Sequence, residues 1–152
     1  MILDKRNEFC DAVALNTGAA GTYLVGDQID LGAVARDVGN GEPMYLVITV
    51  DTLPTSAGAA TAQFQLASDA SASIATNGTA TVHLETKAFA ISEMAAGQML
   101  AAIALPLEGV AYERYLGVLQ ITGTAAFTAG KINAFLTHDV AKWKSYDAPF
   151  QA

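Results

Sequence analysis

The chain has 152 residues and a mass of 15.7 kDa, a length that fits one domain able to bury a core without disulfide staples. Only 15 % of its residues are charged, and the net charge of −7 predicts that the phosphates of nucleic acid are repelled. The single cysteine, Cys10, excludes an intramolecular disulfide framework, and no apolar stretch approaches the roughly 20 residues that span a bilayer. The first residues turn charged at once, unlike a signal peptide. We therefore expect no nucleic-acid partner, no membrane association and synthesis in a cytoplasm.

Short segments with strand patterns follow one another along the chain, separated by clusters of turn-forming residues. The alternation in 61–66 predicts that Ala62, Phe64 and Leu66 point inward, and that in 80–87 predicts the same for Val82 and Leu84. A continuously apolar segment, 44–50, predicts a strand buried on both faces. The expected strands, in chain order, are 12–15, 22–25, 44–50, 61–66, 80–87, 99–105, 115–121 and 132–137.

Three segments fall outside this strand pattern. The window 91–105 predicts one helical turn followed by a strand, because Gly97 interrupts a weak helical start. The small, polar residues 67–79 predict an exposed loop. We expect an all-β jelly-roll or β-sandwich of about eight short antiparallel strands with little helix, in one domain over 1–140. Residues 141–152 form an aromatic tail, part of that domain or an interface arm.

The residues needed for common enzyme chemistry are sparse. The two histidines, His83 and His138, lie on different expected strands, and a surface metal site with Glu85 is far less favoured than solvated side chains. No serine stands in a Gly-x-Ser-x-Gly elbow, and we expect every serine to lie in a loop or in the tail. Gly39-Asn40-Gly41 precedes a strand, which favours a tight turn over a phosphate loop. We expect no catalytic residues, no metal and no cofactor.

Sugar binding is the main alternative function, because jelly rolls commonly present exposed aromatic side chains to carbohydrate. The available platforms are Tyr23, Tyr45, Tyr112 and Tyr115, and three of these four lie in apolar segments where core packing is commoner. A carbohydrate- or receptor-binding jelly-roll module therefore stays open as an alternative.

One run of sequence is similar to a known family. The stretch 30–51, Asp-Leu-Gly-Ala-Val-Ala-Arg-Asp-Val-Gly-Asn-Gly-Glu-Pro-Met-Tyr-Leu-Val-Ile-Thr-Val-Asp, resembles the family of the Bordetella-phage capsid cement protein. Shorter supporting matches, in order and rough spacing, are 9–14, 113–116 and 127–132. The chain departs from the family pattern in the loops 52–59 and 67–79 and after Val140.

This resemblance implies a jelly-roll protein on the outer surface of the virion. It implies binding to a shell of major capsid proteins, as a homodimer or homotrimer at local symmetry axes, with a structural and non-enzymatic role. Within the matched run, Arg36 and Asp37 lie in the loop ahead of the buried strand. We expect an Arg–carboxylate fork that holds this loop, with direct contacts to the capsid as the alternative. Glu113 and Arg114 are expected to act similarly ahead of Tyr115.

Both ends of the chain contain apolar residues that lie outside the expected strands. A hydrophobic content of 52 % also suggests that some surface faces a partner. We expect these ends to make intersubunit or capsid contacts, with packing inside the same molecule as the alternative. The terminal contact residues are Met1, Ile2, Leu3, Phe9, Trp143, Tyr146 and Phe150.

Overall fold

The computed structural model describes residues 4–33, 38 and 41–140, and most of its regular structure is β-strand. Two 3-10 turns, η1 (Lys5–Asn7) and η2 (Ile91–Glu93), are the helical elements of this described part. The expected all-β class, with one helical turn before the strand in 91–105, is confirmed. The strands are β1 (Glu8–Ala14), β2 (Gly21–Asp30), β3 (Tyr45–Ser56), β4 (Thr61–Asp69), β5 (Thr81–Glu85), β6 (Phe89–Ala90), β7 (Met99–Ala104), β8 (Tyr115–Gly123) and β9 (Phe127–Thr137).

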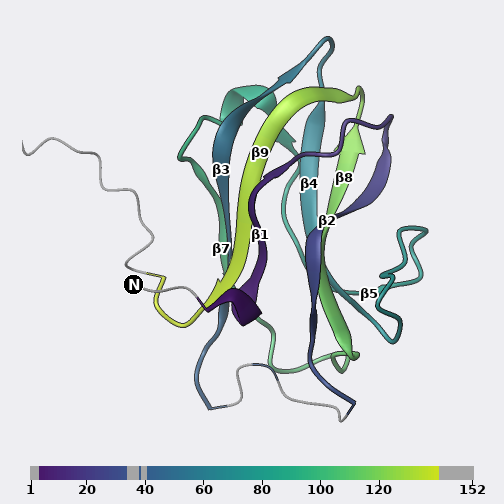
Figure 1. Ribbon diagram of the computed structural model, residues 1–152, viewed down its shortest axis with the longest axis vertical. Helices are drawn as coiled ribbons and strands as arrows, with labels where there is room; N and C mark the ends of the chain where they lie inside the picture. Colours follow the sequence, from purple (N-terminus) through teal and green to yellow (C-terminus); the bar gives the residue numbers. More distant parts are fainter. Residues whose placement is uncertain (1–3, 34–37, 39–40, 141–152) are drawn as a thin grey trace, which may run out of the picture.

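The strands form two antiparallel sheets that face each other (Figure 1). Sheet A has the order β1-β9-β3-β7, and sheet B has the order β2-β8-β4-β5, with the two-residue β6 also beside β4. Apart from the connections among β4, β5 and β6, each connection crosses from one sheet to the other. Interleaved strands of this kind are the jelly-roll arrangement, as expected from the sequence.

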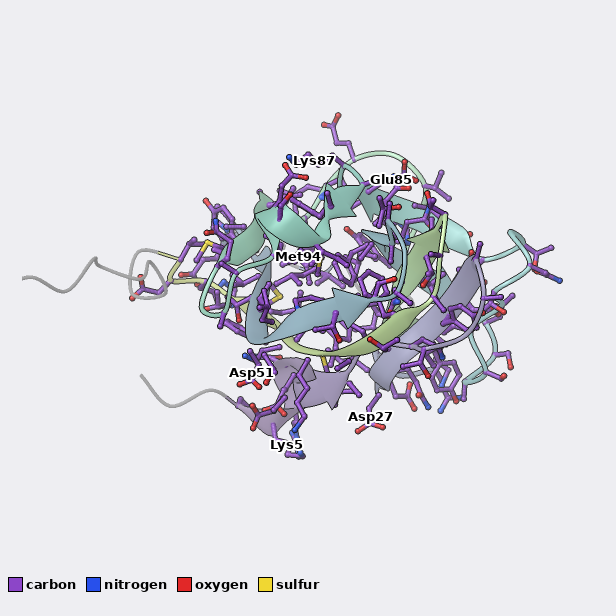
Figure 2. All side chains as sticks on the ribbon, turned by 90° about the horizontal axis from the view of Figure 1, so that it is seen from above. Lys5, Asp27, Asp51, Glu85, Lys87 and Met94 are labelled. Atoms are coloured by element: carbon purple, nitrogen blue, oxygen red, sulfur yellow. The ribbon has the colours of Figure 1, made fainter. Side chains whose placement is uncertain are left out.

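The core lies between the inner faces of the two sheets, where side chains alternate in and out along each strand. On β4 the predicted inward row of Ala62, Phe64 and Leu66 is buried, and these residues pair with Thr122, Gln120 and Val118 of β8. Met94, the residue after η2, is also fully buried in this core (Figure 2). Truncating such a residue to alanine typically costs about 2–5 kcal/mol.

Strand β3 is buried on both faces, as its continuous apolar sequence predicts. Leu46 and Ile48 point into the core opposite Leu136 and Ala134 of β9. Val47 points to the other face of sheet A, where it pairs with Phe135, and both side chains are nevertheless buried. A polar side chain in place of Leu46, Val47 or Ile48 would lose its hydration on whichever face of the sheet it pointed.

The predicted inward position of Val82 is wrong. Leu84 lies opposite Leu66, but Val82 lies opposite Ala67, so β5 carries one extra residue, His83. Such a bulge reverses the alternation beyond it. Val82 therefore faces outward and is 44 % exposed, while Leu84 packs against the core.

The loop after β4 is not simply an exposed connection. Its residue Ile74 folds back over the outer face of sheet B and packs in a small second cluster with Ala67 and Leu119. Gly117 leaves room for this contact, since a Cβ there would stand 2.5 Å from the Ile74 side chain. Asp69 holds the loop by accepting hydrogen bonds from the backbone N–H groups of Ser71 and Ala75.

A buried glutamine ties the β1–β2 connection to sheet B. The Gln120 side chain is fully buried, and its Oε1 accepts from the Asn16 backbone N–H at 2.9 Å. Its Nε2 donates to the Asn16 carbonyl and to Thr122 Oγ1. A buried amide is tolerable here because both of its ends have partners.

The edge strands β1 of sheet A and β2 of sheet B come into close contact at Gly26. Gly26 of β2 has φ 69°, and a Cβ at this position would lie 2.2 Å from the Phe9 carbonyl oxygen. On β1, Ala12 adopts φ 48°, and its N–H donates to Asn133 Oδ1 at 2.6 Å. Asn133 thereby satisfies the backbone group that the bulge in β1 removes from the ladder.

We expect Gly26→Ala to lower the free energy of unfolding by at least about 2 kcal/mol, because it adds a steric clash to left-handed strain. Gly78→Ala is the matched control: Gly78 also has positive φ, but nothing lies within 4 Å of its added Cβ. That variant should lose only about 1 kcal/mol. Urea denaturation measures both, and equal losses would contradict the close-approach explanation.

Candidate interaction surfaces

Of the residues predicted to contact a partner, the structure describes Phe9. Phe9 is 1 % exposed and belongs to the core between the sheets, so its side chain presents no surface to a partner here. It was grouped with the apolar amino terminus, but it is the second residue of β1 and points inward. The other predicted contact residues lie outside the described residues: Met1, Ile2, Leu3, Arg36, Asp37, Trp143, Tyr146 and Phe150.

The sequence predicts that an ion pair holds the chain ahead of Tyr115. The structure has such a pair at Arg114, but its partner is Asp30, which the sequence did not indicate. Arg114 donates from Nε and Nη2 to the two carboxylate oxygens of Asp30, each at 2.9 Å. This bidentate pair holds the pKa of Asp30 down at about 2, aided by the Gly32 N–H. It joins the end of β2 to the start of the adjacent strand β8 in sheet B.

A serine and a histidine meet at the end of sheet B. Ser68 Oγ lies 2.7 Å from His83 Nε2 and also accepts from the Glu113 backbone N–H at 3.0 Å. The His83 ring stacks on Tyr112, with 4.0 Å between the ring centroids. The Glu113 carboxylate accepts from the Thr81 hydroxyl. The sequence interpretation placed Ser68 in a loop and His83 in solvent; Ser68 instead lies in β4, and the bulge turns a half-buried His83 toward it.

This cluster is arranged to join elements rather than to attack a substrate. Ser68 Oγ accepts from the Glu113 N–H and shares a second hydrogen bond with His83 Nε2, in which the tautomer of the imidazole decides which atom donates. Ser68 is 0 % exposed, so no substrate carbonyl reaches its oxygen. Burial lowers the pKa of His83, with a smaller opposing effect from the Glu113 charge. Burial also raises the pKa of Tyr112 to about 12.

Other candidate chemical groups are dispersed. His138 Nδ1 is 3.0 Å from the Pro43 carbonyl oxygen, far along the chain from the His83 cluster. Within the described ranges, no three His, Cys, Asp or Glu side chains gather as a metal site would require. Cys10 is buried, and this burial raises the pKa of its thiol to about 12, which leaves little nucleophilic thiolate.

The four tyrosines considered for sugar stacking do not share one platform. Tyr115 belongs to the outer-face cluster of sheet B, whereas Tyr45 lies in β3 of sheet A. Tyr112 is stacked on His83, and the Tyr23 hydroxyl donates to the Ala19 carbonyl. Tyr45 and Tyr115 thus lie on different sheets, and the rings of Tyr112 and Tyr23 are held by contacts within the molecule.

A groove of about 1240 Å³ runs between the edge strands β1 and β2. Its walls carry Lys5 together with acidic side chains, among them Glu8, Asp11 and Asp27. Figure 2 shows Lys5 and Asp27 on the same side of the sandwich, away from Glu85 and Lys87. The groove is polar and open, and Cys10 lies at its floor, so it has the character of a solvated seam.

Exposed apolar side chains gather after β7. Leu107 is 62 % exposed and Val110 is 69 % exposed, both in the loop that leads from β7 to β8. Ala102 and Ala104 of β7 itself are also exposed. Exposed large apolar groups are costly to hydrate, and a group of them marks a candidate contact surface.

The described part of the molecule is thus a jelly-roll sandwich whose polar clusters serve to hold strands together. The family model described as Bbp16 matches residues 9–136, which extend from β1 to the penultimate residue of β9. The chain belongs to the Bbp16 family, and this match confirms the expected relation to a Bordetella-phage protein family. No curated protein matches the chain. None of the described helices is long and apolar enough to cross a membrane.

We expect the His83 cluster to make stability depend on pH between about 7 and 5. The unfolded chain takes up a proton near pH 6.5, whereas the folded pKa of His83 is lower. Its stabilising contribution is therefore complete above about pH 6.5 and is lost as the pH falls toward the folded pKa. His83→Gln should remove this part of the pH dependence, measured as the unfolding free energy in urea at each pH.

The control is His138→Gln, which removes an exposed imidazole outside the cluster. If His83→Gln and the wild type lose stability in parallel between pH 7 and 5, the cluster is not the source.

Proposed function

We propose that this chain is a cement protein of a tailed-phage capsid, which binds the outer surface of the head and stabilises contacts between major capsid proteins. The observation that carries this proposal is the Bbp16 family match over residues 9–136, which covers nearly all of the jelly roll. It is a structural and non-enzymatic role, with the major capsid protein and further copies of this chain as partners. The virion exterior would be its site of action.

The arrangement of the described residues supports a mechanical role. The buried polar groups of Gln120 and Ser68 and the partly buried amide of Asn133 each connect separate elements of the sandwich. A cross-linked scaffold of this kind bridges two shell subunits without deforming under load. Bridging needs only modest affinity per contact, because the second contact of an oligomer forms at high effective concentration. Partners that bind only the assembled shell also stabilise it by mass action.

The capsid-facing residues stay a prediction from the sequence. Arg36 and Asp37 belong to the run that resembles the cement family, and the terminal apolar residues have no place in the strand pattern. Phe9 is left out of this set because it is part of the core. The tail carries three aromatic residues, Trp143, Tyr146 and Phe150, the type that most often anchors protein interfaces.

Capsid binding tests the proposal directly. Purified protein should co-sediment with capsids of its phage that lack it and should raise the temperature at which they open. Cryo-EM of the complex should show the chain over seams between shell subunits. Saturable binding to glycans without any binding to capsids would overturn the proposal in favour of the sugar-binding alternative.

We expect removal of residues 141–152 to weaken capsid binding or self-association by at least about tenfold, because the truncation deletes three aromatic anchors. Analytical ultracentrifugation and capsid co-sedimentation measure the two effects. The matched variant Lys142→Ala/Lys144→Ala keeps the aromatic residues and should bind nearly as well as wild type. Unchanged oligomer mass and unchanged capsid affinity after truncation would contradict a contact role for the tail.

A further inference from the structure

One end of the sandwich carries both ends of the described chain together with the connections 31–44 and 105–114. The pairing register places the end of β2 beside the start of β8, and the start of β3 beside the ends of β7 and β9. Strand β1 also starts beside the end of β9. All of these points lie at the lower end of the molecule in Figure 1. At the opposite end, the turns 57–60 and 124–126 contain only alanine, glycine and threonine.

The connection 105–114 bears the most exposed large apolar side chains of the described residues. Leu107 and Val110 are both more exposed than Leu53 or Val82, the other large apolar side chains that reach the surface. Glu108 stands between them in the sequence and is exposed as well. This connection therefore holds apolar surface in water at a cost that a partner would remove.

Both ends of this connection are fixed to the sandwich. At its start, the buried Leu105 donates its N–H to the backbone ahead of β3, and the Tyr112 hydroxyl donates to the Pro106 carbonyl at 3.0 Å. At its end, the Glu113 N–H and the Arg114 guanidinium are held by sheet B through the contacts described above. A loop held in this way has less freedom to lose when a partner covers it.

We propose that residues 105–114 form a docking loop, which inserts Leu107 and Val110 into an apolar socket of the major capsid protein that is bordered by Lys or Arg side chains. This inference rests on the proposed function and names a surface that would carry it out. It adds a described part of the molecule to the terminal residues that the sequence predicts as contacts.

Charge is the reason for choosing the shell rather than a second copy as the occupant. The docking loop carries the exposed Glu108, and Glu42 is exposed on the chain ahead of β3 at the same end. Glu113 and Arg114 are engaged within the molecule, by Thr81 and by the carboxylate of β2. A second copy would bring the same carboxylates against this end, on a chain whose net charge is already −7. Basic groups around an apolar socket complement both the carboxylates and the apolar side chains.

The first test removes the apolar side chains of the docking loop. Leu107→Ser/Val110→Ser should weaken co-sedimentation with capsids that lack the protein at least about tenfold, because burial of one such side chain contributes that factor or more. The matched control, Leu53→Ser/Val82→Ser, makes the same changes at exposed positions outside the loop and should bind like wild type. Circular dichroism and the unfolding midpoint check the fold of both variants. Should the double loop variant unfold, Val110→Ser alone is measured in the same way.

The second test neutralises the charge of the docking loop. Glu108→Gln should weaken capsid binding at low salt and make the affinity less dependent on salt, since an ion pair with the shell is lost. The control Asp27→Asn neutralises an exposed carboxylate on β2 and should keep the wild-type salt dependence. A Glu108→Gln variant with the affinity and the salt dependence of wild type would contradict the basic border of the socket.

Sedimentation velocity separates the possible occupants of the docking loop. The Leu107→Ser/Val110→Ser variant should keep the wild-type oligomer mass, and a loss of self-association would overturn the proposal by assigning the loop to a contact between copies. Unchanged capsid affinity would also overturn it, and faster hydrogen exchange across 141–152 in that variant would then identify the tail as the occupant. If wild type and the loop variant bind capsids equally, only this inference fails. If wild-type protein does not bind capsids, the cement proposal fails with it.

Discussion

The inner faces of the two sheets depend on one physical constraint, that an inward side chain of the central strands must be apolar or must have its polar groups hydrogen-bonded. Water is excluded between β3 and β9 on one side and β4 and β8 on the other, so an unpaired polar group there would lose its hydration without compensation. Phe64 and Leu66 meet this requirement on β4, as do Leu46 and Ile48 on β3. The strand order around this core then determines which loops meet at each end of the molecule.

Polar residues enter the interior where they complete the hydrogen bonding of a neighbouring segment. Gln120 saturates the backbone of Asn16, and Asn133 accepts from the N–H of the bulged Ala12. Ser68 receives the N–H of Glu113 and connects it to His83. In each case removal of the side chain would take a hydrogen-bond partner from a partly buried backbone group. These contacts make the jelly roll one cross-linked unit, not two loosely stacked sheets.

The hydrogen-bonded scaffold of the described residues fits the mechanical role proposed above. The buried Cys10 thiol and the enclosed Ser68 hydroxyl are both inaccessible to a substrate. The described surface also offers the uncharged strand β7 and, in the loop after it, the exposed Leu107 and Val110, with the exposed Glu108 between them in the sequence.

The sequence by itself determined the fold class, because alternation and β-branched composition are local properties of each strand. It located most strands, the buried row of β4, the two-faced burial of β3 and the turn at η2. The strands β2, β3 and β9 are longer than the sequence predicts. In β3, Asp51 and Pro54 are residues typical of turns, but pairing with β9 keeps this part of the chain extended. The resemblance of the sequence to a phage family came from residues that the family match also includes.

Only the tertiary structure decided the contacts that join distant segments. The sequence pattern of β5 does not predict the bulge at His83, because the register of β5 depends on how it pairs with β4. The fork between Arg114 and Asp30 joins residues 84 positions apart, and the Ser68–His83 bond appears only when β4 and β5 align. Phe9 reads as part of an apolar terminus until β1 takes its place beside β9 and turns that ring into the core. Local sequence sets which residues favour a strand, whereas side-chain partners follow from strand order and register, which non-local packing determines.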